Sequence, residues 1–301
     1  MATGIVFLVG WLLLVGSDGR RATAVALPAE ATSDSLGLPQ RVRAIDLSGP
    51  FSFCGEVIPV DEPDVRERLD AELLRNAYFH RNTILLLKRQ RRYFPVLERI
   101  LAEEGLPDDL KYLAVAESGL ANTTSVAGAK GVWQFMAPTA RGFGLEVNDE
   151  VDERYHLEKA TRAACAYLKD YHRQFGDWRW VAVAYNMGGP NIKKWKERQR
   201  AATPFELDIN RETMAYLFRI VALKTILQDP ARFGYEIDPA EGYAPLDDYR
   251  TVTVTASIAN LGDFAREQGT TYRRLKVYNP WLVSGELTVS RGNSYDIKVP
   301  E

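Results

Sequence analysis

The sequence predicts a mainly helical protein with a small α/β module at its C-terminal end. Apolar residues recur at i, i+3, i+4, i+7 through much of residues 63–228, a spacing typical of helices with one buried face. From Thr251 the pattern alternates like a strand, continues as two short helical segments and ends in a second alternating run. With 46% hydrophobic and 26% charged residues among 301, the composition is globular and leaves room for two domains.

An apolar run from Ile5 to Val15 predicts export. The run is too short to span a bilayer comfortably but suits the apolar part of a secretory signal. Ala-Val-Ala at residues 24–26 offers a cleavage site, so residues 1–26 are interpreted as a signal peptide or an N-terminal membrane anchor. Because no Lys or Arg precedes the run, an uncleaved anchor stays open. The first cysteine, Cys54, lies too far along the chain for a lipid-anchor signal.

Charge and cysteine content exclude several classes of function. A formal net charge of −2 gives no indication of a nucleic-acid partner. The two cysteines, Cys54 and Cys165, form neither a disulfide scaffold nor a metal site, and Cys165 reads as a small buried apolar residue. The acidic stretch at residues 147–155 lacks the alternating ligands and the glycine of a calcium loop. Nothing in the sequence indicates an oligomeric state.

The helical domain follows a proline-containing segment. Residues 27–60 carry four prolines and no sustained period, so we expect a linker. Residues 61–235 then form the helical domain. Its N-terminal extension is expected to contain two helices, which are separated either near Asn82 or at Pro95.

Further helices are expected along the rest of this domain. Asp108 or Asp109 can cap a helix that ends at Glu117, and Asn210 can cap another. Pro138 opens a short helix. The remaining expected helices cover residues 157–175, 178–186 and 211–228.

The helix that ends at Glu117 places a carboxylate on a buried stripe. Leu110, Leu113, Ala114 and Glu117 fall at i, i+3, i+4, i+7, and Ser118-Gly119 ends the helix at once. Burial and the negative end of the helix dipole both raise the pKa of Glu117 and keep it protonated near neutral pH. A protonated Glu of this kind can act as a general acid. Alternatively, Glu117 bends out to water at a frayed helix end.

A glycine loop, residues 128–136, follows this helix. Its two glycines allow backbone to approach a ligand closely, and Trp133 and Gln134 can flank and hydrogen-bond a sugar. A tryptophan is more often part of the core than a sugar platform. Tyr185 lies on the buried stripe of its helix, close to the helix end, and Tyr216 borders an apolar face. Packing with the hydroxyl in water is the alternative for Tyr216.

Four short motifs, in a particular order along the chain, resemble those of a known enzyme family. They are Glu-Ser at 117–118, Gly-x-x-Gly-x-Trp-Gln-Phe-Met at 128–136, Ala-Tyr-Asn at 184–186 and Glu-Thr-x-x-Tyr at 212–216. The chain resembles the catalytic domain (SLT domain) of family 1 lytic transglycosylases, and within them the membrane-bound lytic murein transglycosylase D type. One departure is visible: the family usually reads Met-Pro-Ser-Thr-Ala, whereas Met136 is followed here by Ala-Pro-Thr-Ala.

The resemblance implies a lysozyme-like (goose-type) fold and an activity on peptidoglycan glycan strands in the periplasm or cell envelope. It assigns Glu117 as the sole catalytic acid and base, cleaving the β-1,4 bond between N-acetylmuramic acid and N-acetylglucosamine to leave a 1,6-anhydromuramoyl end. No metal or cofactor is implied. The substrate-binding residues and roles it implies are Ser118 and Gln134 orienting N-acetyl groups, Tyr216 bonding Glu117, Tyr185 and Asn186 supporting the cationic intermediate, and Met136 lining the cleft.

Two alternatives to this function remain at the level of sequence. One is a hydrolytic muramidase of the same fold, in which water replaces the sugar hydroxyl as nucleophile. The other is a peptidoglycan-binding protein without activity. On any of these readings, the basic cluster at Lys88, Arg89, Arg91 and Arg92 is either a solvated face or an attractor of peptide carboxylates in the cell wall.

The C-terminal segment, residues 249–301, resembles a LysM module. It carries the Asn-Pro of that module at 279–280 and the closing Ile-Lys-Val-Pro at 297–300. The usual Gly-Asp-Thr-Leu opening is absent, and Ser-Ile-Ala-Asn-Leu stands at 257–261 instead. The module is therefore interpreted as degenerate, which leaves its sugar binding open.

Overall fold

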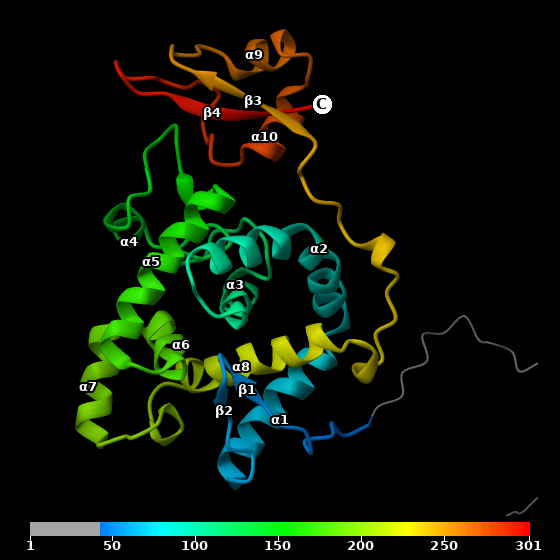
Figure 1. The fold of residues 1–301 in the computed structure, drawn as a ribbon, viewed down its shortest axis with the longest axis vertical. Coiled ribbons are helices and arrows are strands. Elements are labelled where there is room, and N and C mark those ends of the chain that lie inside the picture. The colour runs from blue at the N-terminus through cyan, green and yellow to red at the C-terminus, as the bar shows by residue number, and fades with distance from the viewer. Residues whose placement is uncertain (1–42) are drawn as a thin grey trace, which may run out of the picture. The chain divides into compact units, whose positions relative to one another are not determined.

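The computed structural model describes residues 43–301 and has a helical part followed by a small α/β module (Figure 1). The mainly helical class with a small C-terminal sheet is confirmed. Expectations for the apolar N-terminal run lie outside the described residues. Among the residues described, no helix is long and apolar enough to cross a bilayer.

The helical part contains eight α-helices among the described residues, and the expected helices 157–175 and 211–228 have the bounds predicted. The helices are α1 (Pro63–Ala77), α2 (His80–Glu103), α3 (Lys111–Ser118), α4 (Ala137–Gly142), α5 (Leu157–Phe175), α6 (Trp178–Met187), α7 (Gly189–Gln199) and α8 (Arg211–Gln228). Short 3-10 turns lie at Asp108–Leu110, Glu153–Tyr155, Pro204–Glu206, Ala231–Phe233 and Pro239–Glu241. Helix α7 was not predicted, because Gly188, Gly189 and Pro190 read as a stop. Here Pro190 lies in the first turn of a new helix, where proline is tolerated.

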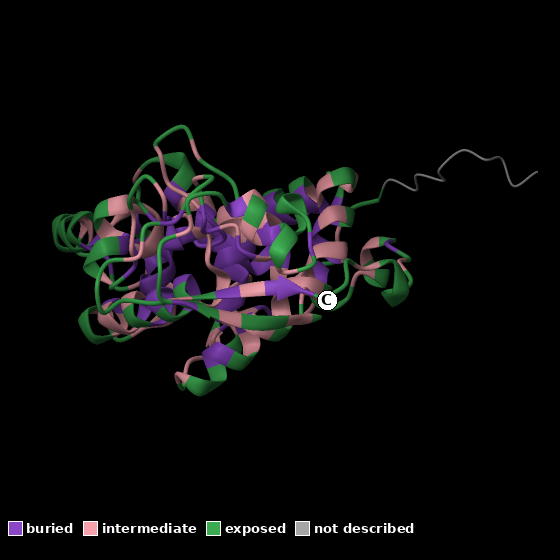
Figure 2. Cartoon of the chain, turned by 90° about the horizontal axis from the view of Figure 1, so that it is seen from above, coloured by how far each residue is buried: buried purple, intermediate pink, exposed green. Residues whose placement is uncertain are grey.

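Helix α8 is the centre of the helical part. It packs against α1, α3 and α6, and its buried residues lie all around its axis, as in a helix enclosed by others. Figure 2 shows that the buried residues of the molecule gather in its interior and the exposed ones on its outer turns. Asn210 caps it as predicted, since the Asn210 Oδ1 accepts a hydrogen bond from the Thr213 amide at 2.9 Å. Helices α3 and α6, which carry two of the four motifs, are thus fixed against one buried element.

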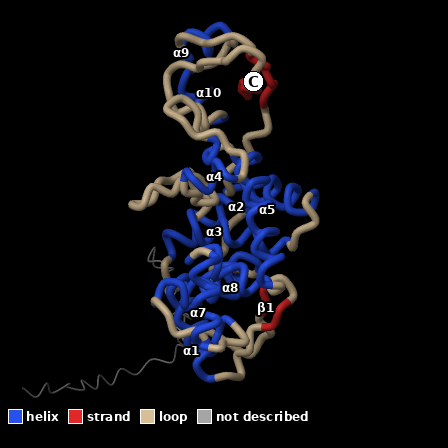
Figure 3. Tube along the Cα trace, turned by 90° about the vertical axis from the view of Figure 1, so that its left-hand side faces the viewer, coloured by secondary structure: helices blue, strands red, loops and turns tan. Residues whose placement is uncertain are grey.

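Residues 45–60 differ from the linker that we expected. Leu47, Phe51, Phe53 and Ile58 are buried in the main hydrophobic core. Two short strands, β1 (Ser52–Phe53) and β2 (Glu56–Val57), pair antiparallel in this segment. The sequence did not predict this packing, because the apolar residues of the segment follow no helical or strand period and its prolines are typical of a linker. Figure 3 shows how small the share of strand is beside the helices.

Of the two breaks considered for the N-terminal helices, the one near Asn82 agrees with the structure, in which α1 and α2 are separated at Tyr78–Phe79. The break at Pro95 is wrong, because Pro95 lies inside α2. The expected cap of α3 is wrong too. Neither aspartate caps α3 by a side-chain bond. Asp109 instead accepts from the Cys54 amide and pairs with Lys224, both at 2.7 Å.

Three arginines of the basic cluster on α2 bind backbone carbonyls, and the attraction of peptide carboxylates by the cluster stays a prediction. Arg89 donates to the Gly119 carbonyl at 2.9 Å, at the end of α3. Arg91 donates to the Pro239 carbonyl at 2.9 Å, and Arg92 to that of Ala244 at 2.8 Å. These arginines fasten the connection at 239–244 and the C-terminal end of α3, where helix carbonyls lack partners.

The C-terminal module has its own core. Strand β3 (Tyr249–Val254) pairs antiparallel with β4 (Tyr295–Pro300), and α9 (Leu261–Glu267) and α10 (Tyr272–Tyr278) lie between them in the chain. Its buried residues include Leu261, Leu275 and Ile297. Strand, two helices and strand follow the order predicted for residues 249–301.

The Asp109–Lys224 pair is expected to be a major contributor to stability. Both side chains are largely buried, with 16% and 14% exposed, so Asp109→Ala leaves an ammonium group without its counter-charge. We expect a loss of about 3 kcal/mol in the free energy of unfolding, measured by urea denaturation. The exposed carboxylate Glu103, which pairs with Arg99 and Arg162 on the surface, is the control. The urea midpoint of Glu103→Ala should stay close to that of the wild type. If the midpoint of Asp109→Ala is also unchanged, burial does not make the Asp109–Lys224 pair important for stability.

Candidate active site

Glu117 lies in the last turn of α3, half-buried, above the fully buried Leu110, Leu113 and Ala114. The helix ends where Gly119 adopts a left-handed conformation (φ 60°) and its amide bonds the Val115 carbonyl. The helix therefore does not fray, and Glu117 stays on the stripe that the sequence assigned to it.

Burial raises the pKa of Glu117 to about 7. A hydrogen bond from the Tyr216 hydroxyl to its Oε1, at 2.5 Å, and the positive charge of Arg219 act in the opposite direction and lower this pKa. Glu212 raises it. Because the pKa is close to neutral, Glu117 can both give and accept a proton under ordinary conditions.

Two tyrosines surround the Glu117 carboxyl. Tyr216 is only 1% exposed, and its hydroxyl donates to Glu117 rather than reaching water. The Tyr185 hydroxyl donates to the Trp133 carbonyl at 2.7 Å, which ties α6 to the glycine loop. Burial, and then the nearby Glu117 charge, raise the pKa of both phenols well above the usual value, so both remain protonated donors.

The glycine loop is shaped by a close approach of two backbones. Gly131 has φ +81°, and a Cβ atom on it would lie 1.8 Å from the Arg154 carbonyl oxygen. No residue other than glycine fits there. Within the loop, Lys130 and Phe135 exchange two backbone hydrogen bonds of 3.1 Å each.

The other predicted site residues lie in or near this loop, and their side chains differ in their hydrogen bonds and in how far they are exposed. Gln134 Nε2 donates to the Gly131 carbonyl at 2.8 Å, so its amide oxygen is the atom left for a ligand. The Ser118 hydroxyl lies 2.8 Å from the Val132 carbonyl and joins α3 to the loop. Asn186 Oδ1 accepts from the Thr213 hydroxyl at 2.8 Å, while Met136 is 43% exposed.

Trp133 is a core residue, which overturns the reading of its indole as a surface beside a sugar. It is fully buried, and its Nε1 donates to the Thr161 hydroxyl at 2.9 Å. Trp133 contributes to the site through its backbone carbonyl, which accepts a hydrogen bond from the Tyr185 hydroxyl. The apolar neighbours Val132 and Phe135 are buried as well.

Sequence reasoning missed Arg219 and the role of Glu212. The Arg219 guanidinium binds both oxygens of Glu212, at 2.8 and 3.2 Å, across two turns of α8. Their i, i+7 spacing along one helix was the available signal. Glu212 is thereby neutralised by an arginine, and no group of three or more His, Cys, Asp or Glu in the described part is arranged to hold a metal ion.

The module carries a hollow of its own. It has a volume of about 460 Å³ and is lined by Ala259, Asn260, Gly262, Tyr272, Ser284, Gly285 and Glu286. Asn260, from the segment that replaces the usual opening, caps α9 through bonds from the Gly262 and Asp263 amides. The altered opening therefore still starts this helix.

Comparison with known families agrees with the arrangement of motifs. Residues 95–207 match the transglycosylase SLT domain family, and residues 250–301 match the soluble lytic transglycosylase C-terminal LysM-like domain. The chain thus carries an SLT domain followed by a LysM-like domain.

Similar proteins were found among curated relatives and solved structures. The membrane-bound lytic murein transglycosylase D of Escherichia coli K12 is 26% identical over 83% of this chain and 55% of its own length. A putative tributyltin chloride resistance protein of Alteromonas is 27% identical over 46% of this chain and 68% of its own. The lytic transglycosylase Slt of Pseudomonas aeruginosa is 22% identical with a TM-score of 0.39, over 50% of this chain and 26% of its own. The chain spans about half the length of the first of these relatives.

Glu117→Gln is expected to stabilise the fold increasingly as the pH rises from about 4.5 to about 7, with the full effect above that window. Because the folded state raises the pKa of Glu117 from 4.5 to about 7, the wild-type chain loses stability as the pH rises through that window. The uncharged amide avoids this loss, about 2 kcal/mol after discounting for partial exposure. Urea midpoints of the two proteins should differ at about pH 8 and converge at about pH 4. A difference of equal size at both pH values would show that the carboxyl is not perturbed.

Proposed function

We propose that this chain is a peptidoglycan lytic transglycosylase that uses Glu117 as its only acid and base. The observation that carries the proposal is a half-buried carboxyl with a pKa of about 7, bonded by a buried tyrosine beside a tightly folded glycine loop. The SLT domain match and the murein transglycosylase relative support the same activity. Its substrate is then the β-1,4 bond between N-acetylmuramic acid and N-acetylglucosamine, in the cell envelope.

In the first step, protonated Glu117 donates its proton to the glycosidic oxygen as the bond from that oxygen to the muramoyl C1 breaks. The N-acetylglucosamine side leaves with a new hydroxyl. Positive charge develops at C1 and is stabilised by the substrate's own 2-acetamido group. Gln134 and Ser118 are assigned to orient the N-acetyl groups, and Tyr185 and Asn186 support the cationic intermediate.

In the second step, the Glu117 carboxylate takes the proton of the muramoyl C6 hydroxyl, and the oxygen of that hydroxyl bonds to C1. This closes the 1,6-anhydro ring and returns Glu117 to its protonated form, so no water is consumed. A nucleophile held within the same sugar has a high effective concentration compared with bulk water. Met136 is assigned to line the site near the bond that breaks.

A single carboxylate is consistent with the charges around the site. Glycosidases of the ordinary kind need two acidic groups that flank the bond. Glu212, which affects the pKa of Glu117, is bound on both oxygens by Arg219 and is not free to act as a nucleophile. The alternative, a hydrolytic muramidase, would use the same Glu117 with water in place of the C6 hydroxyl.

The products distinguish the two reactions. Purified peptidoglycan digested by this protein should release muramoyl ends that lack a reducing terminus and are lighter by one water, about 18 Da, than those of a hydrolase. Mass spectrometry of the separated fragments checks this. Glu117→Gln should release no fragments, because an amide cannot transfer the proton, while Glu103→Gln on α2 keeps full activity. Predominance of reducing, water-added ends would replace the transglycosylase with the muramidase.

Tyr216→Phe is expected to move the alkaline limb of the pH–activity profile upward. The Tyr216 hydrogen bond lowers the pKa of Glu117, so its removal leaves the acid protonated to higher pH. The profile of kcat/KM on soluble glycan measures this shift. Tyr235→Phe is the matched control, because that buried hydroxyl donates to the Ala77 carbonyl instead. A limb that stays in place, or moves downward, would mean that Tyr216 does not tune Glu117.

A further inference from the structure

The helical domain and the LysM-like module meet along residues 146–156, which we call the docking loop, and through an ion pair between Glu158 on α5 and Lys298 on β4. On the module side, the Asp152 amide donates to the Trp281 carbonyl at 2.8 Å, and the Val283 amide donates to the Glu150 carbonyl at 2.9 Å. Val151 forms an antiparallel bridge with Leu282. The docking loop therefore adds a short piece of backbone pairing to the module.

Side chains of the docking loop also enter or bind the module. Val151 is only 1% exposed and belongs to the module's hydrophobic core, although it is distant in sequence. The Glu150 carboxylate accepts from the Thr288 amide at 2.6 Å and from its hydroxyl at 3.0 Å. The Tyr295 hydroxyl lies 3.0 Å from both oxygens of Glu146. The module's core is completed by a residue of the SLT domain, unlike that of a module on a free tether.

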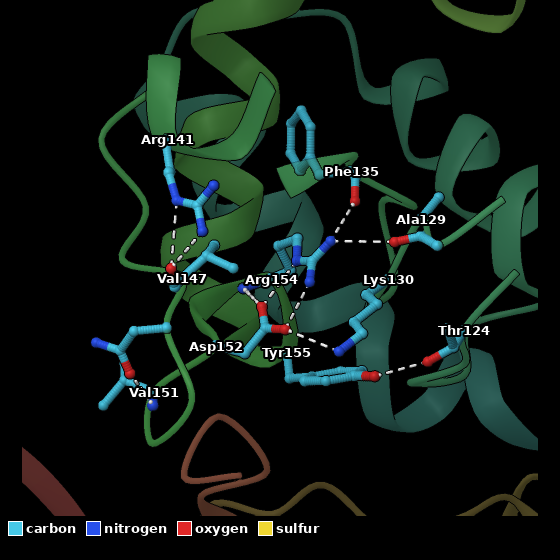
Figure 4. Close-up of polar contacts among 12 residues, drawn as sticks. Thr124, Ala129, Lys130, Phe135, Arg141, Val147, Val151, Asp152, Arg154 and Tyr155 are labelled. Carbon is cyan, nitrogen blue, oxygen red and sulfur yellow. Dashed lines mark hydrogen bonds and ion pairs between the residues drawn. The ribbon is translucent and has the colours of Figure 1, made fainter. Parts of the chain in front are cut away.

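The same docking loop binds the glycine loop of the candidate active site on its other side. Figure 4 shows the Arg154 guanidinium between Asp152 and the glycine loop. Arg154 bonds both Asp152 oxygens, at 2.8 and 2.7 Å, and donates to the Gly128 and Phe135 carbonyls at 3.2 Å. Lys130 of the glycine loop lies 3.3 Å from Asp152.

The contacts between the docking loop and the glycine loop are largely shielded from solvent. Asp152 and Arg154 have 3% and 5% of their side chains exposed, so their pairing is little screened by solvent. Arg154 also places its carbonyl against Gly131, where no side chain would fit. A shift of the docking loop would therefore be transmitted to the glycine loop and to the Trp133 carbonyl that receives Tyr185.

We propose that the LysM-like module, through the docking loop, positions the glycine loop of the active site, with Asp152 as the residue that joins them. Its amide is bound to the module, and its carboxylate holds the arginine and lysine that contact the glycine loop. The module is then part of the catalytic architecture in addition to any affinity for the polymer. The effect on catalysis rests on the proposed function, whereas the mechanical link does not.

The test uses Val151→Ala in the full chain, with Val299→Ala as the matched control. Both valines are 1% exposed in the same core, but Val299 belongs to the module's own β4. Hydrogen exchange of the Lys130, Gly131 and Phe135 amides reports on the glycine loop. KM and kcat on short soluble glycan report on the site, because a loss of polymer retention would leave these unchanged.

We expect Val151→Ala to accelerate exchange in the glycine loop and to raise KM about tenfold through a misplaced loop, with a smaller change in kcat. Val299→Ala should leave both unchanged. Asp152→Asn, which keeps the amide bond to Trp281 but weakens the grip on Arg154 and Lys130, should reproduce the effect with the module still docked.

Exchange of the Val252 and Ile297 amides, within the β3–β4 pair, shows whether the module stays folded in each variant. If Val151→Ala frees the Asp152 and Val283 amides while glycine-loop exchange stays slow, the proposal is overturned. Equal effects of Val151→Ala and Val299→Ala would overturn it too, since module stability alone would explain them. Should the wild-type chain cleave no glycan, the proposed function fails, and the exchange data still decide the mechanical link.

Discussion

The burial of one carboxyl group at the end of a helix governs the arrangement of this site. Glu117 cannot leave its position, because α3 is closed by the left-handed Gly119 and continues a fully buried stripe. Desolvation of the carboxylate then moves its pKa to about 7. The rest of the site supplies donors that can work with a carboxyl in either protonation state, since Tyr216 can donate to it in both.

Helix α8 links stability to this chemistry. It packs against α1, α3 and α6, and it carries Tyr216 toward Glu117 and Arg219 toward Glu212. Near its other end, Lys224 is held by Asp109, just before α3. A helix enclosed on all sides has little freedom to shift, so the distance between the acid and its tyrosine is set by core packing rather than by a surface loop.

The sequence predicted best those features that depend on local periodicity. The bounds of α5 and α8 and the buried stripe below Glu117 follow from spacing, and the Asn210 cap follows from the residue type at a helix start. Features that depend on distant partners could not be read in this way: Trp133 is buried through its bond to Thr161, and the basic cluster of α2 binds carbonyls far along the chain. The packed segment at residues 45–60 and the insertion of Val151 into the module's core are likewise products of tertiary contact.

The central claim is that Glu117 titrates near neutral pH and can therefore serve as both acid and base. Carbon-13 NMR of the glutamate side-chain carboxyls across a pH titration measures this directly, with the Glu117 resonance identified by its loss in Glu117→Gln. The account predicts a midpoint of about 7 for this resonance. A midpoint near the ordinary value of 4.5 would contradict it, because the carboxyl would then be ionised at neutral pH and could not start the reaction as an acid.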